Sequence, residues 1–441
     1  MFKRTRPGYC ATALLIAASH AAADPTAPHL PPAQTPAVAV AGDAETGYTL
    51  TRDGEPYFVL GAGGQDHLAQ LVAAGGNTIR TWGVGPETMD LLDAAHARGL
   101  TVAVGLWLEH ERHGFDYGDP EALAEQTAMV REAVLAYRHH PAVLLWGLGN
   151  EMEGFGEGDD TRIWDHVQQL AAMVKQLDPA RPAMTTITEV GGQRIPMVHE
   201  RCPDIDIVGI NSYGGASSIP QRYREAGGTK PYMITEFGPL GTWEVGKTEW
   251  GAVIEPTSTQ KAEFYRSSYL GGVESERGGL SLGSFIFLWG EKQEATATWF
   301  GMFLPFGERL GSVDTMQELW SGTDPDNAVP TVEPLTPRGP VRLQPGATLK
   351  VELQARDPEG DPLQVSWRLK SEASEYRLGG DAEPRVAEYP SAVIEAELDH
   401  ATLRMPEAPG AYRIFAYVRD GHGGAATANL PLLVLDPQPE E

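Results

Sequence analysis

Two glutamates end apolar runs of the sequence, at positions from which carboxylates could do chemistry together. The run over 143–149 leads into Asn150 and Glu151, and the run over 231–235 leads into Glu236. Runs of this kind are typical of buried parallel strands that carry polar side chains to one rim of a barrel. Of two facing carboxylates, one can protonate a leaving oxygen while the other attacks or activates water. Cleavage of a glycosidic bond needs this division of work, with retention or inversion decided by a spacing that the sequence leaves open.

The elements that must position these glutamates follow a repeated strand-then-helix pattern, which predicts an α/β fold with a parallel sheet. The predicted strands are 57–61, 77–82, 101–108, 143–149, 183–188, 205–212, 232–235 and 283–289. The predicted helices between them are 65–74, 86–98, 120–139, 161–177, 194–200, 220–226 and 258–276. This number and order of units over about 260 residues indicates a (β/α)₈ barrel. A doubly wound open sheet is the alternative.

Because the active sites of such barrels lie at the C-terminal strand ends, the residues that end the predicted strands form the candidate site. Besides the two glutamates, the strand ends carry Arg80, Trp82, His110, Asn150, Asn211, Tyr213 and Trp289. A carboxylate beside Arg80 has its charged form favoured, and a second carboxyl near that charge has its pKa raised. These two environments would suit a nucleophile and a proton donor. The structural alternatives are an ordinary ion pair for Arg80 and plain packing for Tyr213 and Trp289.

Three motifs in this order carry a resemblance to a known family. They are 76–82, 140–151, which runs from His-Pro-Ala-Val into Trp-Gly-Leu-Gly-Asn-Glu, and 234–238, Ile-Thr-Glu-Phe-Gly. Together they resemble the catalytic barrel of glycoside hydrolase family 2, a family of β-galactosidases, β-mannosidases and β-glucuronidases in the retaining clan A. The resemblance covers residues 48–320.

The resemblance implies a role for each matching residue. Glu151 would be the general acid/base and Glu236 the nucleophile of a retaining O-glycoside hydrolase. Asn150 would hydrogen-bond the sugar 2-hydroxyl, Arg80 and Tyr213 would donate to Glu236, and Trp289 would be a floor on which a sugar ring stacks. Family 2 enzymes usually carry two β-domains before the barrel that help form an exo-acting pocket. Their place is taken here by a leader and a linker, so an open cleft and a β-glucan-like oligo- or polysaccharide are expected.

A metal site and two other functions compete with this interpretation. The stretch 109–113, Glu-His-Glu-Arg-His, lacks the order of a zinc-binding motif, so we expect neither a metal nor a cofactor, and His110 or His113 could instead contact substrate. The same two glutamates could also serve a transglycosylase, with Trp243, Trp250 or Trp299 in an acceptor subsite. A non-catalytic carbohydrate-binding protein of the cell envelope is the alternative from another class.

Beyond the barrel the pattern changes to the period of two that is typical of strands. Predicted strands at 349–355, 363–369, 393–398, 412–418 and 425–434 are separated by Asp/Gly turns. They indicate a small all-β, immunoglobulin-like antiparallel sandwich. The predicted organisation is therefore a barrel over 48–323, a proline- and acid-rich linker over 324–340 and the sandwich over 341–437.

The N-terminus and the overall charge bound the setting of the protein. Residues 1–23 have a basic start, a short apolar core and an Ala-Ala-Ala cleavage site, which predicts a signal peptide and export to the periplasm or medium. A proline/alanine-rich linker over 24–47 follows. The formal net charge of -26 excludes nucleic acid and anionic membranes as favoured partners. After leader removal no integral membrane segment is expected, and Cys202 is the one cysteine left, an inert buried thiol.

Overall fold

A computed structural model describes residues 35–377 and 379–436 of the chain. The predicted signal peptide and the first part of the predicted linker lie outside the described residues. Within the part that the structure describes, no helix has both the length and the apolarity needed to cross a membrane.

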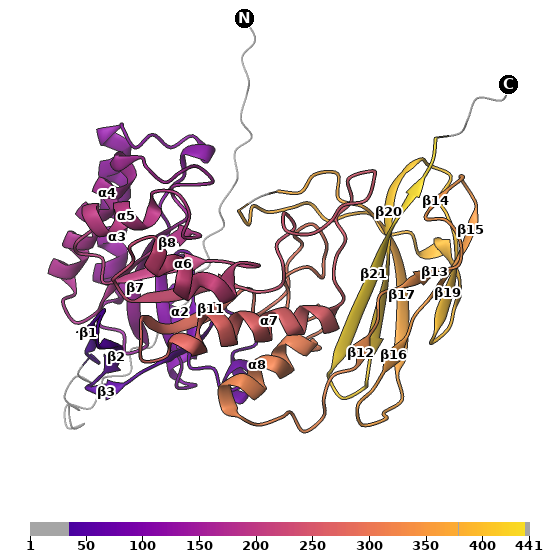
Figure 1. Ribbon diagram of the computed structural model, residues 1–441, viewed down its shortest axis with the longest axis horizontal. Coiled ribbons are helices and arrows are strands. Elements are labelled where there is room, and N and C mark those ends of the chain that lie inside the picture. Colours follow the sequence, from indigo (N-terminus) through magenta and orange to yellow (C-terminus); the bar gives the residue numbers. More distant parts are fainter. Residues whose placement is uncertain (1–34, 378, 437–441) are drawn as a thin grey trace, which may run out of the picture. The chain divides into compact units, whose positions relative to one another are not determined.

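Eight parallel strands close into a barrel, as predicted, and their order is β10-β11-β4-β5-β6-β7-β8-β9. Figure 1 shows most of this part of the chain in indigo to magenta. They are β4 Val59–Gly63, β5 Thr78–Arg80, β6 Thr101–Leu106, β7 Val143–Asn150, β8 Ala183–Thr188, β9 Ile207–Asn211, β10 Tyr232–Phe237 and β11 Ser281–Ile286. The helices are α1 Leu68–Ala73, α2 Thr88–His96, α3 Pro120–Tyr137, α4 Thr161–Leu177, α5 Arg194–Arg201, α6 Ile219–Glu225, α7 Ser258–Gly272 and α8 Gly311–Ser321. Short 3₁₀ turns are η1 Glu111–His113, η2 Ala216–Ser218 and η3 Glu274–Glu276. The open-sheet alternative is therefore wrong, and α8 is a helix that the sequence pattern missed.

Side-chain caps fix where the longest helices begin. The carboxylates of Asp119 and Asp160 accept hydrogen bonds from backbone N–H groups in the first turns of α3 and α4. Thr257 and Gln260 form a reciprocal capping box at the start of α7. Because each cap follows a strand and its loop, the caps also set where the βα loops end.

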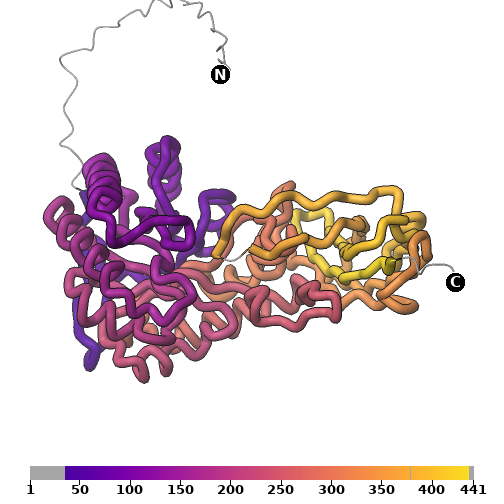
Figure 2. Tube along the Cα trace, turned by 90° about the horizontal axis from the view of Figure 1, so that it is seen from above, coloured from indigo at the N-terminus to yellow at the C-terminus, as the bar shows by residue number. Residues whose placement is uncertain are grey.

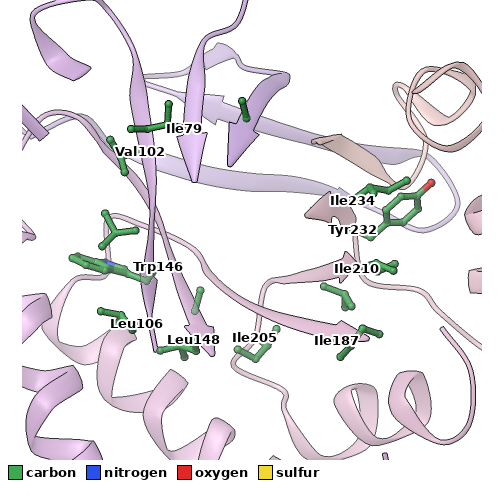
Figure 3. Packing of buried hydrophobic residues seen from close by; sticks show 14 of the residues in the cluster. Ile79, Val102, Leu106, Trp146, Leu148, Ile187, Ile205, Ile210, Tyr232 and Ile234 are labelled. Carbon is green, nitrogen blue, oxygen red and sulfur yellow. The ribbon is translucent and has the colours of Figure 1, made fainter. Parts of the chain in front are cut away.

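Alternate residues of the barrel strands enter two different apolar clusters. Val102, Trp146 and Ile234 belong to the cluster that packs against the helices, part of which is drawn in Figure 3. Their strand neighbours Ala103 and Met233 belong to a second cluster inside the barrel. This alternation is the period of two that buried strands require, and it leaves the C-terminal strand ends as the place for polar groups.

The hairpin of β1 (Val38–Asp43) and β2 (Gly47–Arg52), extended by β3 (Glu55–Pro56), corrects the predicted linker. Val38 and Leu50 are almost fully buried in the same cluster as the barrel interior. Residues from 38 onward are therefore not a linker. They form a strand pair because their alternating apolar side chains can be buried against the N-terminal strand ends.

The C-terminal part contains two four-stranded sheets, β13-β15-β19-β18 and β14-β21-β20-β17, and a pair β12-β16. Their bounds are β12 Thr331–Val332, β13 Thr336–Pro337, β14 Arg342–Leu343, β15 Thr348–Glu352, β16 Ala355–Arg356, β17 Gln364–Ser371, β18 Val393–Ala396, β19 His400–Arg404, β20 Gly410–Arg419 and β21 Ala425–Val434, with the 3₁₀ turn η4 Pro390–Ala392. One apolar cluster draws residues from both four-stranded sheets, so they pack as a sandwich (Figure 2).

Two details of this sandwich differ from the prediction. The sheets are not wholly antiparallel, because β14 pairs with β21 in parallel. The predicted linker over 324–340 also contains β12 and β13, which pair with β16 and β15. Prolines and acids dominate these residues, so the short edge strands leave no period-two signal in the sequence.

Candidate active site

The C-terminal ends of the barrel strands surround one cavity of about 580 Å³. This volume lies in the range of small-molecule binding sites. From the predicted site, the lining includes Trp82, Asn150, Glu151, Asn211, Tyr213 and Glu236. The structure therefore brings residues from strands β5, β7, β9 and β10 into one place, as the strand-end argument predicted.

Glu236, at the end of β10, is held by three donors. Nη1 of Arg80 lies 2.9 Å from Oε1, and Nε1 of Trp82 donates to the same oxygen at 2.8 Å. The Tyr213 hydroxyl donates to Oε2 at 3.0 Å. Burial, followed by the charge of Glu236, raises the pKa of Tyr213 well above its usual value, so this hydroxyl keeps its proton. A buried carboxylate with a cation and two further donors is stabilised in its charged form.

Asn150 and Asn211 connect the environments of the two glutamates. Oδ1 of Asn150 accepts from Nη2 of Arg80 at 2.7 Å and from Nδ2 of Asn211 at 3.1 Å. The same Nδ2 donates to Oε1 of Glu151 at 2.7 Å. The hydroxyl of Thr235 fixes Asn211 by donating to its Oδ1 at 2.8 Å. Each amide is thus oriented by a hydrogen bond on its oxygen.

Glu151 follows β7 in a turn that needs unusual backbone angles. Gly149 has φ +73°, and a Cβ there would meet Sδ of Met152 at 2.0 Å, so this position requires glycine. Glu151 itself has φ +56°, which a side-chain-bearing residue adopts only at a cost of about 1–3 kcal/mol. The turn lifts the Glu151 carboxyl out of the strand and into the cavity.

The electrostatics of Glu151 differ from those of Glu236. Burial, followed by the negative charge of Glu236, raises the pKa of Glu151 to about 8. The hydrogen bond from Asn211 and the more distant Arg80 act in the opposite direction and only in part offset these causes. At neutral pH the cavity therefore pairs a protonated Glu151 with Glu236.

The prediction that Trp289 forms a stacking floor is wrong. Trp289 is 1% exposed, its ring packs edge-on against Phe303 at 5.1 Å, and its indole N–H donates to the carbonyl of His67. Strand β11 ends at Ile286, and the chain then presents Phe287 and Leu288 to the cavity. The tryptophan beyond them turns into the core, where both its ring and its donor are satisfied.

His110 does not line the cavity and stands behind it. It is 3% exposed and stacks on Trp107 at 4.9 Å, and it is Trp107 that lines the cavity. Burial lowers the pKa of His110 to about 4, so the ring is neutral. The stacking contact makes it a residue that positions Trp107.

Several lining residues come from loops, where the sequence pattern does not indicate which residue faces the cavity. Phe155 and Trp243 are large aromatic side chains with more than half of their surface exposed. The remaining lining residues outside the prediction are Trp107, Thr188, Glu189, Ser212, Glu244, Phe287, Leu288, Lys292, Glu294, Gly379, Gly380 and Asp381. Of the aromatic acceptor candidates, Trp243 alone is among the lining residues, since Trp299 is buried and Trp250 lines a separate hollow. The signal available for Trp243 was an aromatic residue on the long loop that follows the Glu236 strand.

The described residues include no group of three or more His, Cys, Asp or Glu side chains arranged to hold a metal ion. Residues of the Glu109–His113 stretch contact different partners. His113 pairs with Asp381, and Glu111 pairs with Arg162. Cys202 is buried, and burial raises the pKa of its thiol to about 12.

The chain is thus a (β/α)₈ barrel in which two glutamates, at the ends of β7 and β10, line one cavity. This places it in the class of barrels with a pair of carboxyl groups at the C-terminal strand ends. Within this class, residues 91–271 match the family model described as glycosyl hydrolases family 2, TIM barrel domain. This match confirms the resemblance to the family 2 barrel that the motifs predicted. No curated protein matches the sequence.

Several solved structures are similar to this chain at low sequence identity. A β-glucuronidase from Ruminococcus gnavus is 15% identical over 66% of this chain and 53% of its own, with a TM-score of 0.50. A β-D-glucuronidase from Dictyoglomus thermophilum is 16% identical over 66% and 54%, with a TM-score of 0.49. An endo-β-1,4-mannanase from Thermotoga petrophila is 13% identical over 87% and 99%, with a TM-score of 0.46. The chain thus spans about half the length of the glucuronidases, and the likeness to the Ruminococcus gnavus enzyme concerns the fold alone.

Proposed function

We propose that this chain is an exported retaining β-glycoside hydrolase that cleaves an oligo- or polysaccharide, β-glucan-like in character, by double displacement. The observation that carries the proposal is the difference between the two glutamates of one cavity. Glu236 accepts hydrogen bonds from Arg80, Trp82 and Tyr213, while the pKa of Glu151 is raised to about 8. This difference supports Glu236 as the nucleophile and Glu151 as the proton donor.

In the first step, a carboxylate oxygen of Glu236 forms a bond to the anomeric carbon. The bond from that carbon to the glycosidic oxygen breaks, and Glu151 gives its proton to the departing oxygen. The product is a glycosyl ester of Glu236. The hydrogen bonds that Oδ1 of Asn150 accepts from Arg80 and Asn211 hold its amide, so Nδ2 is the atom that donates to a sugar hydroxyl.

In the second step, the role of Glu151 changes because Glu236 has lost its charge. Once Glu236 is an ester, its negative charge no longer raises the pKa of Glu151. Glu151, now a carboxylate, takes a proton from water as the water oxygen attacks the anomeric carbon. Glu236 leaves as a carboxylate, and the sugar keeps its original anomeric configuration.

The charges around the cavity support a neutral sugar over a uronic acid. The acidic lining residues beside the catalytic pair are Glu189, Glu244, Glu294 and Asp381, and Lys292 is the cation among the lining residues. Lys292 already donates to Glu294 and to the carbonyl of Gly380. A sugar carboxylate would meet negative charge without a ready partner, which costs several kcal/mol.

Variants of the two glutamates test the mechanism on a panel of β-glucans, mannans and galactosides, with products read by mass. Glu236→Ala should abolish turnover, and near-normal rates in this variant would overturn the proposal. Glu151→Ala should lose more activity on substrates with poor leaving groups than on aryl glycosides, which need less protonation. Equal losses on both would contradict the acid role.

Transglycosylation by the same glutamates is a second candidate, and the exposed aromatics Phe155 and Trp243 in the lining favour it. Aromatic faces could hold an acceptor sugar whose hydroxyl replaces water in the second step. Product mass spectra with chains longer than the substrate would support this candidate, and shortened products alone would exclude it.

Export is proposed from the leader pattern of residues 1–23. The test is the mass of the protein recovered from the periplasm or medium of an expressing bacterium. A mature chain starting near Asp24 supports export, and a full-length chain confined to the cytoplasm contradicts it.

A further inference from the structure

The C-terminal sandwich contributes residues to the cavity that holds the two glutamates. Between β17 and η4 lies a segment, here the sandwich loop, whose described residues are 372–377 and 379–389. Gly379, Gly380 and Asp381 of this loop line the cavity together with Glu151 and Glu236. In Figure 2, a stretch of chain in the orange of the sandwich extends to the barrel. No barrel strand or βα loop supplies this part of the lining.

The sandwich loop is held by the loops that follow β6 and β11. Nη2 of Arg112 lies 3.3 Å from the Gly379 carbonyl oxygen and 3.3 Å from Oδ1 of Asp381. Nζ of Lys292 donates to the Gly380 carbonyl at 2.8 Å. In the barrel order, β4 and β5 lie between β11 and β6. The βα loops of β4 and β5, residues 64–67 and 81–87, are short, and the sandwich loop contacts the loops on either side of them.

Glycine is required where the loop approaches the barrel. Gly379 and Gly380 have φ +68° and +75°, a backbone region that side-chain-bearing residues rarely adopt. A Cβ at Gly379 would lie 2.3 Å from Arg112, and one at Gly380 would lie 3.2 Å from Lys292. The two glycines therefore allow the backbone to approach these cations closely.

Buried polar contacts anchor the base of the loop. Glu372 accepts from the guanidinium of Arg413 at 2.8 Å, and both side chains are almost fully buried. Tyr376 donates to Glu372 at 3.0 Å and accepts from the backbone N–H of Val253, in the loop after β10, at 3.2 Å. Nearer the tip, Glu383 accepts from the backbone N–H of Ala295 at 2.8 Å. Contacts at the base, middle and tip place the loop as a fixed wall.

We infer that the sandwich loop forms a sugar-binding subsite of the active site, in which Asp381 accepts a hydrogen bond from a hydroxyl of a neutral sugar residue next to the one that reacts. This inference rests on the proposed function. Trp107, backed on one face by His110, lines the same cavity and offers an aromatic surface for that sugar. A cavity that combines an aromatic surface with a few polar groups suits a ring that has polar edges and apolar faces.

The test compares Asp381→Asn with Glu388→Gln. Both changes remove one carboxylate charge from the sandwich loop, but Glu388 pairs with Arg368 on β17 and is not among the lining residues. For Asp381→Asn we expect a loss in kcat/KM of about tenfold on an oligosaccharide, carried by KM, and little change on an aryl monosaccharide glycoside. Glu388→Gln should match the wild type on both substrates.

Three results would overturn the inference. They are an unchanged KM for the oligosaccharide in Asp381→Asn, an equal loss in both variants, and an equal loss on the long and short substrates. Calorimetric binding of the oligosaccharide in a Glu236→Gln background separates the inference from the proposed function. One outcome is that the wild type shows no turnover while Asp381→Asn weakens this binding about tenfold. In that case the proposed hydrolase activity fails and the subsite stands.

Discussion

The charge of Glu236 should determine how strongly Glu151 holds its proton. In Glu236→Gln the carboxylate becomes a neutral amide of almost the same shape, so burial of Glu151 is preserved while the neighbouring negative charge is lost. We expect the pKa of Glu151 to fall in this variant, but to remain above its usual value of 4.5, because burial is the larger cause of its rise to about 8.

The size of the fall follows from Coulomb's law. Carboxyl groups of retaining glycosidases stand about 5–5.5 Å apart, and at an effective dielectric constant of about 20 two unit charges at this distance repel by about 3 kcal/mol, or about two pKa units. Arg80 contacts Glu236 at 2.9 Å and neutralises part of its charge. Burial must also account for the larger share of a rise from 4.5 to about 8. A fall of about 1 to 1.5 units is therefore expected.

Carboxyl ¹³C NMR of protein labelled at glutamate side chains measures this pKa, with the Glu151 signal assigned by its absence in Glu151→Gln. In the wild type, the protonated form of Glu151 is the active acid, so kcat/KM should decline as pH rises through about 8. A Glu151 pKa that stays near 8 in Glu236→Gln would refute the electrostatic coupling. A wild-type pKa near 4.5 would refute the assignment of Glu151 as the acid.

Three further substitutions and one control substitution have expected outcomes. Arg80→Met removes the cation of a buried ion pair. The free energy of unfolding, measured by denaturant titration, should drop by about 3–5 kcal/mol, and kcat should fall by about 100-fold. A variant as stable as the wild type would contradict this. Trp82→Phe keeps a ring but removes the N–H donor to Glu236, so kcat should fall about tenfold at nearly constant KM in steady-state assays. Arg413→Met should lower thermal stability strongly because its buried partners lose their donor, whereas the exposed Arg338→Met should leave the melting temperature unchanged.

Strand ends were the part of the site that the sequence could specify. Glu151 and Glu236 each follow an apolar run with the length of a buried strand, and Arg80 lies near the end of the predicted strand 77–82. Closure of a barrel brings such ends together wherever they fall in the chain. The order of the elements and the side of the sheet are enough to place such ends. They also place Asn150 and Asn211, whose roles depend on the same rim.

The eighth strand shows why the same reasoning failed for Trp289. Its apolar run continues through Phe285-Ile286-Phe287-Leu288-Trp289 without a polar residue to mark where the strand ends. The predicted strand end lies three residues too late. The prediction therefore names a residue that faces the core and misses one that faces the cavity. Hydrogen bonding and packing decide between them, since the core gives Trp289 an acceptor in the His67 carbonyl.

The sandwich loop could not be predicted for a different reason. Its sequence between 372 and 389 is polar, rich in Glu, Arg and Gly, and has the composition of any exposed connection. Its position depends on partners more than 80 residues away, including Arg112, Val253 and Lys292, and on backbone carbonyls that every residue type supplies. A site that seemed to belong to the barrel alone thus takes one wall from the other domain. It follows that the barrel cut off at residue 323 should lose this wall and should bind longer substrates less well than the whole chain, even where both glutamates keep their hydrogen bonds.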